Sequence, residues 1–226
     1  MRKNINKLNS TFSIQSFEGG YDKNFSYILT CLKTTESIII DASLHPSILE
    51  FSQENKPSAI FITHSHNDHV KYIKSFIDRY PDIKIVGHPE SKLNTSENNY
   101  FPSMHNSTIK VGKLNIKTLH TPGHYFDSIC FHFENIIFTG DTMFVGRTGR
   151  TISNGSSVKD LYNSIYKTIL TLPQSTIIYP GHNYGKVPSI SIRKNIEISP
   201  LLQARDKNDF ENRMKNYEKN RYDLKL

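Results

Sequence analysis

Several features that would set the class of this 226-residue chain at once are scarce or missing. The chain has two cysteines and no tryptophan. Cys31 and Cys130 both lie inside apolar runs typical of strands, so we expect buried free thiols in a reducing compartment rather than a disulfide. No apolar run approaches the roughly 20 residues that a membrane-spanning helix needs. The basic start Met1-Arg2-Lys3 is not followed by an apolar stretch, so we expect no signal peptide and a cytoplasmic protein.

Dense runs of basic residues are also missing, although the formal net charge is +7 and the pI is about 9.2. Lys and Arg are spread along the chain, which argues against a nucleic-acid-binding surface. We therefore expect no nucleic-acid partner and no membrane partner. The length fits one domain, residues 1–226, that ends in a short helical tail from about 200 to 226. The oligomeric state is left open.

Histidine, in contrast, is concentrated in one segment. His64-Ser65-His66-Asn67-Asp68-His69 places four potential metal ligands within six residues. The run Ala59–Thr63 before it is apolar and β-branched and predicts a buried strand, whereas apolar residues recur at helical spacing from Val70 to Ile77. The ligands should therefore lie on a strand-to-helix turn, where binding groups are common. Imidazole and carboxylate together suit zinc, iron or manganese better than calcium or magnesium.

Three further segments share one pattern, an apolar strand followed by a tight turn that carries one His or Asp. They are Thr121-Pro122-Gly123-His124, Gly140-Asp141-Thr142 and Tyr179-Pro180-Gly181-His182. Four such strand ends would bring seven ligands to one rim of a sheet: His64, His66, Asp68, His69, His124, Asp141 and His182. A structural zinc is closed by four protein ligands, usually with Cys, whereas a catalytic zinc keeps a position for water. A set of seven without a thiolate therefore favours a catalytic pair of metals.

The order H-x-H-x-D-H, T-P-G-H, G-D-T and P-G-H resembles the metallo-β-lactamase superfamily from about Gly20 to Tyr184. The resemblance implies an α/β fold, the αββα four-layer sandwich, with metals at one edge between two sheets. Within the superfamily the chain is most similar to the glyoxalase II thioesterases and the persulfide dioxygenases. Gly149-Arg150-Thr151 after the G-D-T turn, Tyr184 after His182, and the helix that begins near Leu161 carry this closer likeness.

The resemblance also implies a ligand set. His64, His66 and His124 would bind one divalent metal, Asp68, His69 and His182 would bind the other, and Asp141 would bridge them. Asp68 and Asp141 are the candidate catalytic residues. Two such metals, zinc or a zinc and iron mixture, would make hydroxide available at neutral pH and stabilise an oxyanion.

The leaving group completes this expectation. A thiol with a pKa of about 8.5 can leave as thiolate without a general acid. We therefore expect a hydrolase that cleaves a thioester, with hydroxyacyl-glutathione as the candidate substrate.

A second interpretation uses some of the same residues. Persulfide dioxygenases hold one Fe(II) through residues that match His64, His124 and Asp141, the facial triad of non-haem iron enzymes, and would act on glutathione persulfide. Where those dioxygenases often carry Cys and Asp, this chain has Thr148 and Ile152, which favours neither interpretation. A nuclease and a non-catalytic member of the fold are less favoured, because basic runs are missing and all seven ligands are intact.

Substrate contacts depend on two residues that match positions touching glutathione in these relatives, Arg150 and Tyr184. Arg can bind a carboxylate through two parallel hydrogen bonds, which suits an acidic tripeptide. A solvated surface arginine and a packing tyrosine are equally open interpretations. We expect a small thiol-derived substrate, and a thiol carrier other than glutathione also fits.

Local patterns predict several further elements. We expect a hairpin of strands 25–32 and 37–41, a helix over 47–53, a strand over 83–86, and loops over 91–107 and 145–156, the first able to cover the site. Ser157 and Asp160 resemble a capping box before a helix, and Phe210, Met214 and Tyr217 predict a C-terminal helix. Five histidines are assigned no role: His45, His88, His105, His120 and His132.

Overall fold

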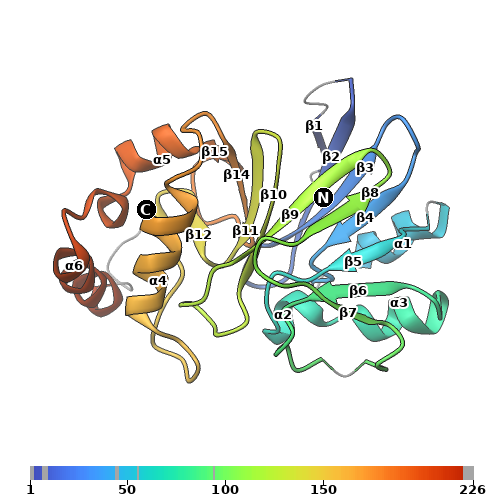
Figure 1. Cartoon of the computed structure of the whole chain (residues 1–226), viewed down its shortest axis with the longest axis horizontal. Helices are drawn as coiled ribbons and strands as arrows, with labels where there is room; N and C mark the ends of the chain where they lie inside the picture. The colour runs from blue at the N-terminus through green and yellow to red at the C-terminus, as the bar shows by residue number, and fades with distance from the viewer. Residues whose placement is uncertain (1–2, 7–9, 44–45, 55, 94, 221–226) are drawn as a thin grey trace.

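The computed structural model describes residues 3–6, 10–43, 46–54, 56–93 and 95–220 (Figure 1). Two mixed sheets dominate this part of the chain. The first has the strand order β1-β2-β3-β4-β5-β6-β7 and the second the order β15-β14-β11-β10-β9-β8, with β12 and β13 as a separate pair. The strands are β1 (Lys3–Asn6), β2 (Phe12–Gly19), β3 (Asn24–Cys31), β4 (Ser37–Ile40), β5 (Ala59–Phe61), β6 (Lys84–Gly87), β7 (Tyr100–Pro102), β8 (Thr108–Val111), β9 (Leu114–His120), β10 (Ile129–Phe133), β11 (Ile136–Gly140), β12 (Met143–Phe144), β13 (Arg147–Thr148), β14 (Ile177–Pro180) and β15 (Ile190–Ser191).

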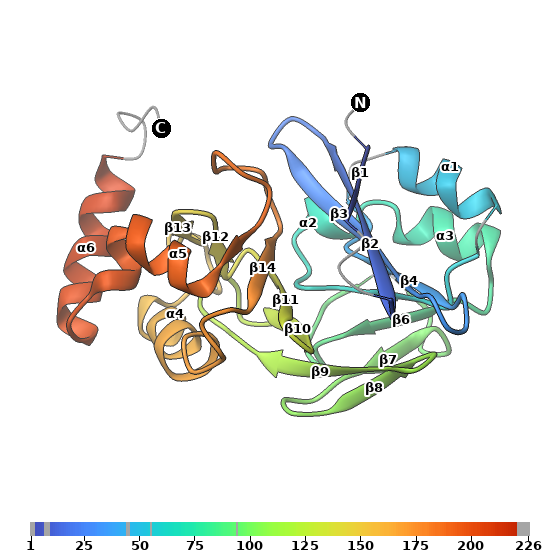
Figure 2. The ribbon, with the colours of Figure 1, turned by 90° about the horizontal axis from the view of Figure 1, so that it is seen from above.

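Helices cover the outer face of each sheet, so the chain forms four layers (Figures 1 and 2). The first sheet is covered by α1 (Pro46–Glu54), α2 (Asn67–Val70) and α3 (Ile73–Arg79). The second is covered by α4 (Val158–Ser164) with the π-helical turn η1 (Ile165–Ile169), by α5 (Ile192–Ile198) with the 3-10 turn η2 (Pro200–Gln203), and by α6 (Lys207–Lys219). The predicted αββα sandwich is confirmed.

Three apolar cores hold the layers together. Between the sheets, alternate strand residues face each other, and the rings of Phe61 and Phe131 lie 4.9 Å apart. A second core joins the second sheet to α4, η1 and α6 through residues such as Leu161 and Phe210, and a third joins the first sheet to α1 and α3 through residues such as Phe76. Burial of these faces on both sides of each sheet explains why the central strands read as continuous apolar runs.

The two sheets meet at the edge where the predicted ligands lie. Phe25 at the start of β3 donates its backbone N–H to Gly181 O (2.7 Å), and the Tyr27 hydroxyl donates to Pro180 O (2.7 Å). An isolated β-bridge pairs Asn24 with His182. These contacts fix the end of β14, in the second sheet, against β3, in the first.

Most of the predicted elements are present. The expected hairpin is β3 paired antiparallel with β4, and the Ser157 side chain caps α4 by accepting from Asp160 N. In α6, Phe210 and Met214 are buried. His45 and residues 221–226 of the predicted tail lie outside the described residues. The description as a single domain stays a prediction.

Two predicted loops are wrong in part. The segment 91–107 contains β7, which pairs parallel with β6, and the segment 145–156 contains β13. Both strands are two or three residues long, too short for a periodic pattern to reveal. None of the described residues of 91–107 lines the cavity at the ligands, so the described part of the segment does not cover the site as expected. Among the described helices, none is long and apolar enough to span a membrane.

Candidate metal centre

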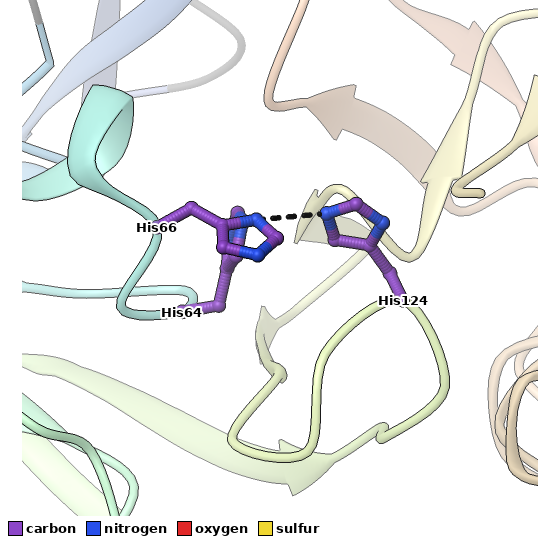
Figure 3. A group of neighbouring side chains, drawn as sticks. All are labelled: His64, His66 and His124. Carbon is purple, nitrogen blue, oxygen red and sulfur yellow. Dashed lines mark hydrogen bonds between the residues drawn. The ribbon is translucent and has the colours of Figure 1, made fainter. Parts of the chain in front are cut away.

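All seven predicted ligands lie together at the edge where the two sheets meet. Two lie in the turn between β5 and α2, two lie in α2 itself, one lies in the turn between β9 and β10, one follows β11, and one follows β14. Figure 3 shows His64 and His66, from the turn before α2, with His124 facing them from the β9–β10 turn. Segments far apart in sequence therefore place their side chains at one point in space.

The ligand atoms form overlapping groups of three, two of which share no residue and are joined by a third group, His64, His69 and Asp141. His66 Nδ1 lies 2.9 Å from His64 Nε2 and 3.1 Å from His124 Nε2 (Figure 3). In the second group, His182 Nε2 lies 3.3 Å from His69 Nε2 and 3.5 Å from Asp68 Oδ2.

The carboxylate of Asp141 lies between the two groups. Its Oδ2 is 3.5 Å from His124 Nε2 and 3.3 Å from His182 Nε2, and its Oδ1 is 3.4 Å from His69 Nε2. With metal–nitrogen bonds of about 2.0 Å, two ligand atoms of a tetrahedral site lie about 3.3 Å apart. The observed separations therefore match the edges of metal coordination shells.

In an imidazole, the hydrogen bond made by the ring nitrogen that points away from the centre determines whether the nitrogen that faces the centre carries a hydrogen or a lone pair. His69 Nδ1 lies 2.8 Å from Asp41 Oδ2, and an ionised carboxylate can only accept, so Nδ1 carries a hydrogen. Thr63 Oγ1 donates to the same Asp41 oxygen (2.8 Å), which leaves it able to accept from His64 Nδ1 (3.2 Å). The Nε2 atom of each of these two histidines therefore carries no hydrogen and points its lone pair toward the centre.

His124 and His182 are set in the same way by backbone carbonyls, whereas His66 directs its Nδ1 toward the centre. His124 Nδ1 donates to Arg150 O (3.1 Å), and His182 Nδ1 donates to Asp22 O (2.9 Å). Four Nε2 lone pairs that converge cannot hydrogen-bond to one another and need protons or cations between them. Partners that fix the tautomer of a metal-binding histidine are the usual support of such sites. The donor set therefore fits divalent metal ions.

Charges divide the centre into two halves. Burial lowers the pKa of His64 well below its usual value, and burial together with His124 lowers the pKa of His66 to about 4. Burial would also lower the pKa of His69 and His182, but the carboxylate of Asp141 outweighs it and raises both. Burial would raise the pKa of Asp141, but His182 and His69 outweigh it and hold this pKa well below its usual range. Without metal, protons are therefore held by His69 and His182.

Metal binding at neutral pH should displace these protons. Because the pKa of His69 is raised, its pairing with Asp141 and Asp41 stabilises the metal-free fold below the usual histidine pKa of about 6.5 and is lost as the pH rises through the raised pKa. We expect zinc titrations of the metal-free protein at pH 7 to give heats that depend on the ionisation enthalpy of the buffer. The dependence should fade at a pH well above the raised pKa values. Equal heats in Tris and phosphate at pH 7 would contradict this charge assignment.

Two glycines of the motifs are required by close approach. Gly140 has φ of 48°, and a Cβ there would lie 2.5 Å from Thr63 Oγ1. A Cβ on Gly181 would lie 2.3 Å from Asp141 Oδ1. The glycine of the G-D-T motif and the glycine of the second P-G-H motif thus allow the close approach that brings the ligands together.

Asp41, which supports His69, was not predicted from the sequence as part of the site. Asp41 is 2% exposed, has φ of 58°, and accepts from Thr63 N, Thr63 Oγ1 and His69 Nδ1. A signal was present, because Asp41 directly follows the apolar strand β4 as Asp141 follows β11. Asn24, which donates to Asp68 Oδ2 (2.9 Å), had no comparable signal.

A cavity of about 630 Å³ opens over the centre, and the two predicted substrate residues line it. The side chain of Arg150 makes no ion pair within the described residues. The Tyr184 ring stacks on His182, with centroids 4.8 Å apart, and its hydroxyl donates to Asp22. Arg147, which the sequence analysis did not select, also lines this cavity.

The four described histidines without an assigned role lie outside the centre. His88 and His120 stack on each other with ring centroids 4.2 Å apart, and His105 Nδ1 accepts from His120 N (3.1 Å). His132 is half-buried on β10. None of these four belongs to a group of described side chains close enough together to hold a metal.

Comparisons with known proteins agree with this geometry. The model of the Metallo-beta-lactamase superfamily matches residues 19–182. The probable hydroxyacylglutathione hydrolase glo2 of Schizosaccharomyces pombe is 31% identical over 177 residues, which cover 74% of this chain and 66% of that protein. The probable polyketide biosynthesis zinc-dependent hydrolase PksB of Bacillus subtilis is 29% identical over 198 residues, covering 82% and 85%.

Among solved structures, ETHE1 from Myxococcus xanthus superposes with a TM-score of 0.79 at 26% identity and covers 90% of each chain. The chain spans about two thirds of the length of the hydroxyacylglutathione hydrolases that it matches. The family model covers well over half of the residues, including all seven ligand positions. This chain belongs to the metallo-β-lactamase superfamily.

Proposed function

We propose that this chain is a metal-dependent hydrolase of the glyoxalase II type, which cleaves a thioester. The observation that carries the proposal is the convergence of seven His and Asp side chains, two separate groups of three with Asp141 within 3.5 Å of a histidine of each, without a thiolate among them. Relatives named hydroxyacylglutathione hydrolase support the reaction class. A hydroxyacyl-glutathione is accordingly the first substrate to test.

The roles of the protein groups follow from their positions. His64, His66 and His124 would hold one divalent ion, Asp68, His69 and His182 a second, and Asp141 both. Bound there, such ions would lower the pKa of water and polarise the substrate carbonyl.

Asp68 is the group best placed to receive a proton. Burial by itself would raise its pKa, but His69 and the hydrogen bond from Asn24 lower it, so the carboxylate is ionised at neutral pH. Asp68 also lines the cavity. It can therefore orient a water molecule and accept its proton.

Arg150 is proposed to bind an acidic group of the thiol. Its carbonyl holds His124, which fixes the backbone, while its side chain lines the cavity beside the metal ligands. A guanidinium group without an ion-pair partner can take a carboxylate through two parallel hydrogen bonds. Tyr184, stacked on His182, forms another wall of the same cavity.

A second candidate is a mononuclear iron persulfide dioxygenase that uses His64, His124 and Asp141. The observation that favours it is the likeness to ETHE1, which covers this chain over almost its full length. Asp141 Oδ2 lies 3.5 Å from His124 Nε2, a separation compatible with one shared ion.

Metal content separates the two candidates. We expect protein expressed with both zinc and iron to contain about two divalent ions per chain and to release thiol from S-lactoylglutathione. One iron per chain, with oxygen uptake on glutathione persulfide and no thioester cleavage, would refute the hydrolase and favour the dioxygenase. Folded protein that binds no metal would contradict both.

A further inference from the structure

A second cavity lies beside the metal centre, lined by residues of the turn of β12 and β13, of the end of α5 with η2, and of α6. Figure 2 shows these elements next to one another. The cavity has a volume of about 1010 Å³, counted out into the solvent to which it opens. Its floor is apolar and comes from Ile198, Pro200, Leu201 and the ring of Tyr217. Ile198 is 54% exposed, so a large apolar side chain is left uncovered there. We call this cavity the α6 groove.

The α6 groove lies next to the cavity over the metal ligands. Arg147 and Tyr217 line both spaces. On one side of this shared wall, the Arg147 guanidinium lies over the Tyr184 ring (5.5 Å) and donates to Tyr184 O (3.4 Å). On the other side, Glu218 of α6 accepts from Thr151 N (2.7 Å), next to Arg150. A thiol arm in the metal cavity therefore meets, at Arg147 and Tyr217, two residues that also line the groove.

The polar groups of the α6 groove are all able to donate hydrogen bonds. They are Arg147, Arg213, Asn216 and Asn220, and no Asp or Glu is among the described residues that line it. Arg213 is held by Asp209 and by Pro200 O, whereas Arg147 makes no ion pair within the described residues. This lining suits a chain of methylenes that carries carbonyl or other acceptor oxygens. It does not suit a cation.

We propose that the α6 groove binds the thiol arm of the substrate and that this arm is of the pantetheine type, with methylenes and amide carbonyls and without an ammonium group. The inference rests on the proposed thioester hydrolysis. Glutathione can pair with Arg150, but its ammonium group finds no acidic partner among the described residues that line the groove and faces the cationic Arg147 and Arg213 instead. A pantetheine arm places its methylenes against Ile198, Leu201 and Tyr217 and offers a carbonyl to Arg147.

Binding of thioethers tests the inference without requiring catalysis. S-methylpantetheine and S-methylglutathione are titrated by calorimetry into the full chain loaded with zinc. We expect S-methylpantetheine to bind more tightly, and Ile198→Asp to weaken it about tenfold while leaving S-methylglutathione unchanged, because the loss of one or two methylene contacts has about this effect. Met104→Asp is the matched control, since Met104 is 63% exposed and does not line the groove, and it should alter neither affinity.

Other results would overturn the inference. S-methylglutathione that binds as tightly as S-methylpantetheine, or an Ile198→Asp variant with unchanged affinity for S-methylpantetheine, would show that the thiol arm does not use the groove. An Ile198→Asp variant that loses only a preference for longer acyl chains would assign the groove to the acyl side. Conversion of a dimer to a monomer by Ile198→Asp would identify it as a contact between two copies. Loss of thioester cleavage with the binding preference intact would instead refute the proposed function.

Discussion

Replacing Asp141 with Asn should lower kcat/KM for thioester hydrolysis more than about 100-fold, since even the partners of metal ligands cost 10- to 100-fold when removed. Asp141 is the side chain common to both groups of ligands, within 3.5 Å of His124, His182 and His69. Asparagine keeps the shape but loses the charge, and its amide nitrogen would face an imidazole or a cation where an oxygen is needed. We therefore expect weaker binding of both ions.

Elemental analysis and steady-state kinetics on the same preparation check this prediction. Asp82→Asn is the matched control, because Asp82 is exposed on the surface and the same chemical change there should leave both measurements unaltered. Full turnover by Asp141→Asn with a full complement of metal would remove Asp141 from the centre. Loss of activity with both ions still bound tightly would restrict its role to the reaction itself.

Asp41→Asn should weaken the second metal site by about 10- to 100-fold and the first site by less. Asp41 contacts His69 directly through Nδ1, whereas it reaches the first site only through Thr63, whose Oγ1 donates to Asp41 and faces His64 Nδ1. Asparagine tolerates the left-handed backbone at this position, where φ is 58°, so the turn should be kept. Loss of the negative charge would make the His69 ring a weaker base. The amide NH₂ of the asparagine would also face a hydrogen-bond donor, either His69 Nδ1–H or the N–H or hydroxyl of Thr63.

Competition with a zinc chelator gives both affinities in one titration. We expect both binding steps of the wild type to remain in Asp41→Asn, with one of them shifted to a higher free zinc concentration by clearly more than the other. The melting temperature of the metal-free protein shows whether the fold is also affected, and Asp82→Asn again serves as the reference. Two unchanged affinities would mean that Asp41 merely closes the turn after β4.

Much of the fold and of the candidate centre can be predicted from local patterns. The apolar run 59–63 followed by H-x-H-x-D-H predicts strand β5 and a turn rich in ligands, and three further strand ends repeat the pattern. Such signals lie within a few residues and reflect burial on both faces of a central strand. The order of the motifs then predicts the αββα sandwich through resemblance to the superfamily.

What could not be predicted depends on contacts between distant segments. Asp41 reaches His69 across 28 residues, and Arg147 becomes significant only where α6 meets the turn of β12 and β13. Strand β7 forms because β6 offers it backbone partners, although three residues carry no periodic signal. None of these has a local pattern of its own, because their partners are supplied by folding.

By itself, the sequence determined which side chains could serve the centre, since histidine and carboxylate chemistry at strand ends is a local property. Only the tertiary structure decided which nitrogen of His64, His69, His124 and His182 faces inward, because that choice depends on a carboxylate, a hydroxyl or a carbonyl. It alone also placed the α6 groove beside the metal cavity. Packing of α6 against α4 and η2 brings Tyr217 to the wall that it shares with Arg147, about 70 residues apart in the chain, because close-packed helices fix where each side chain lies.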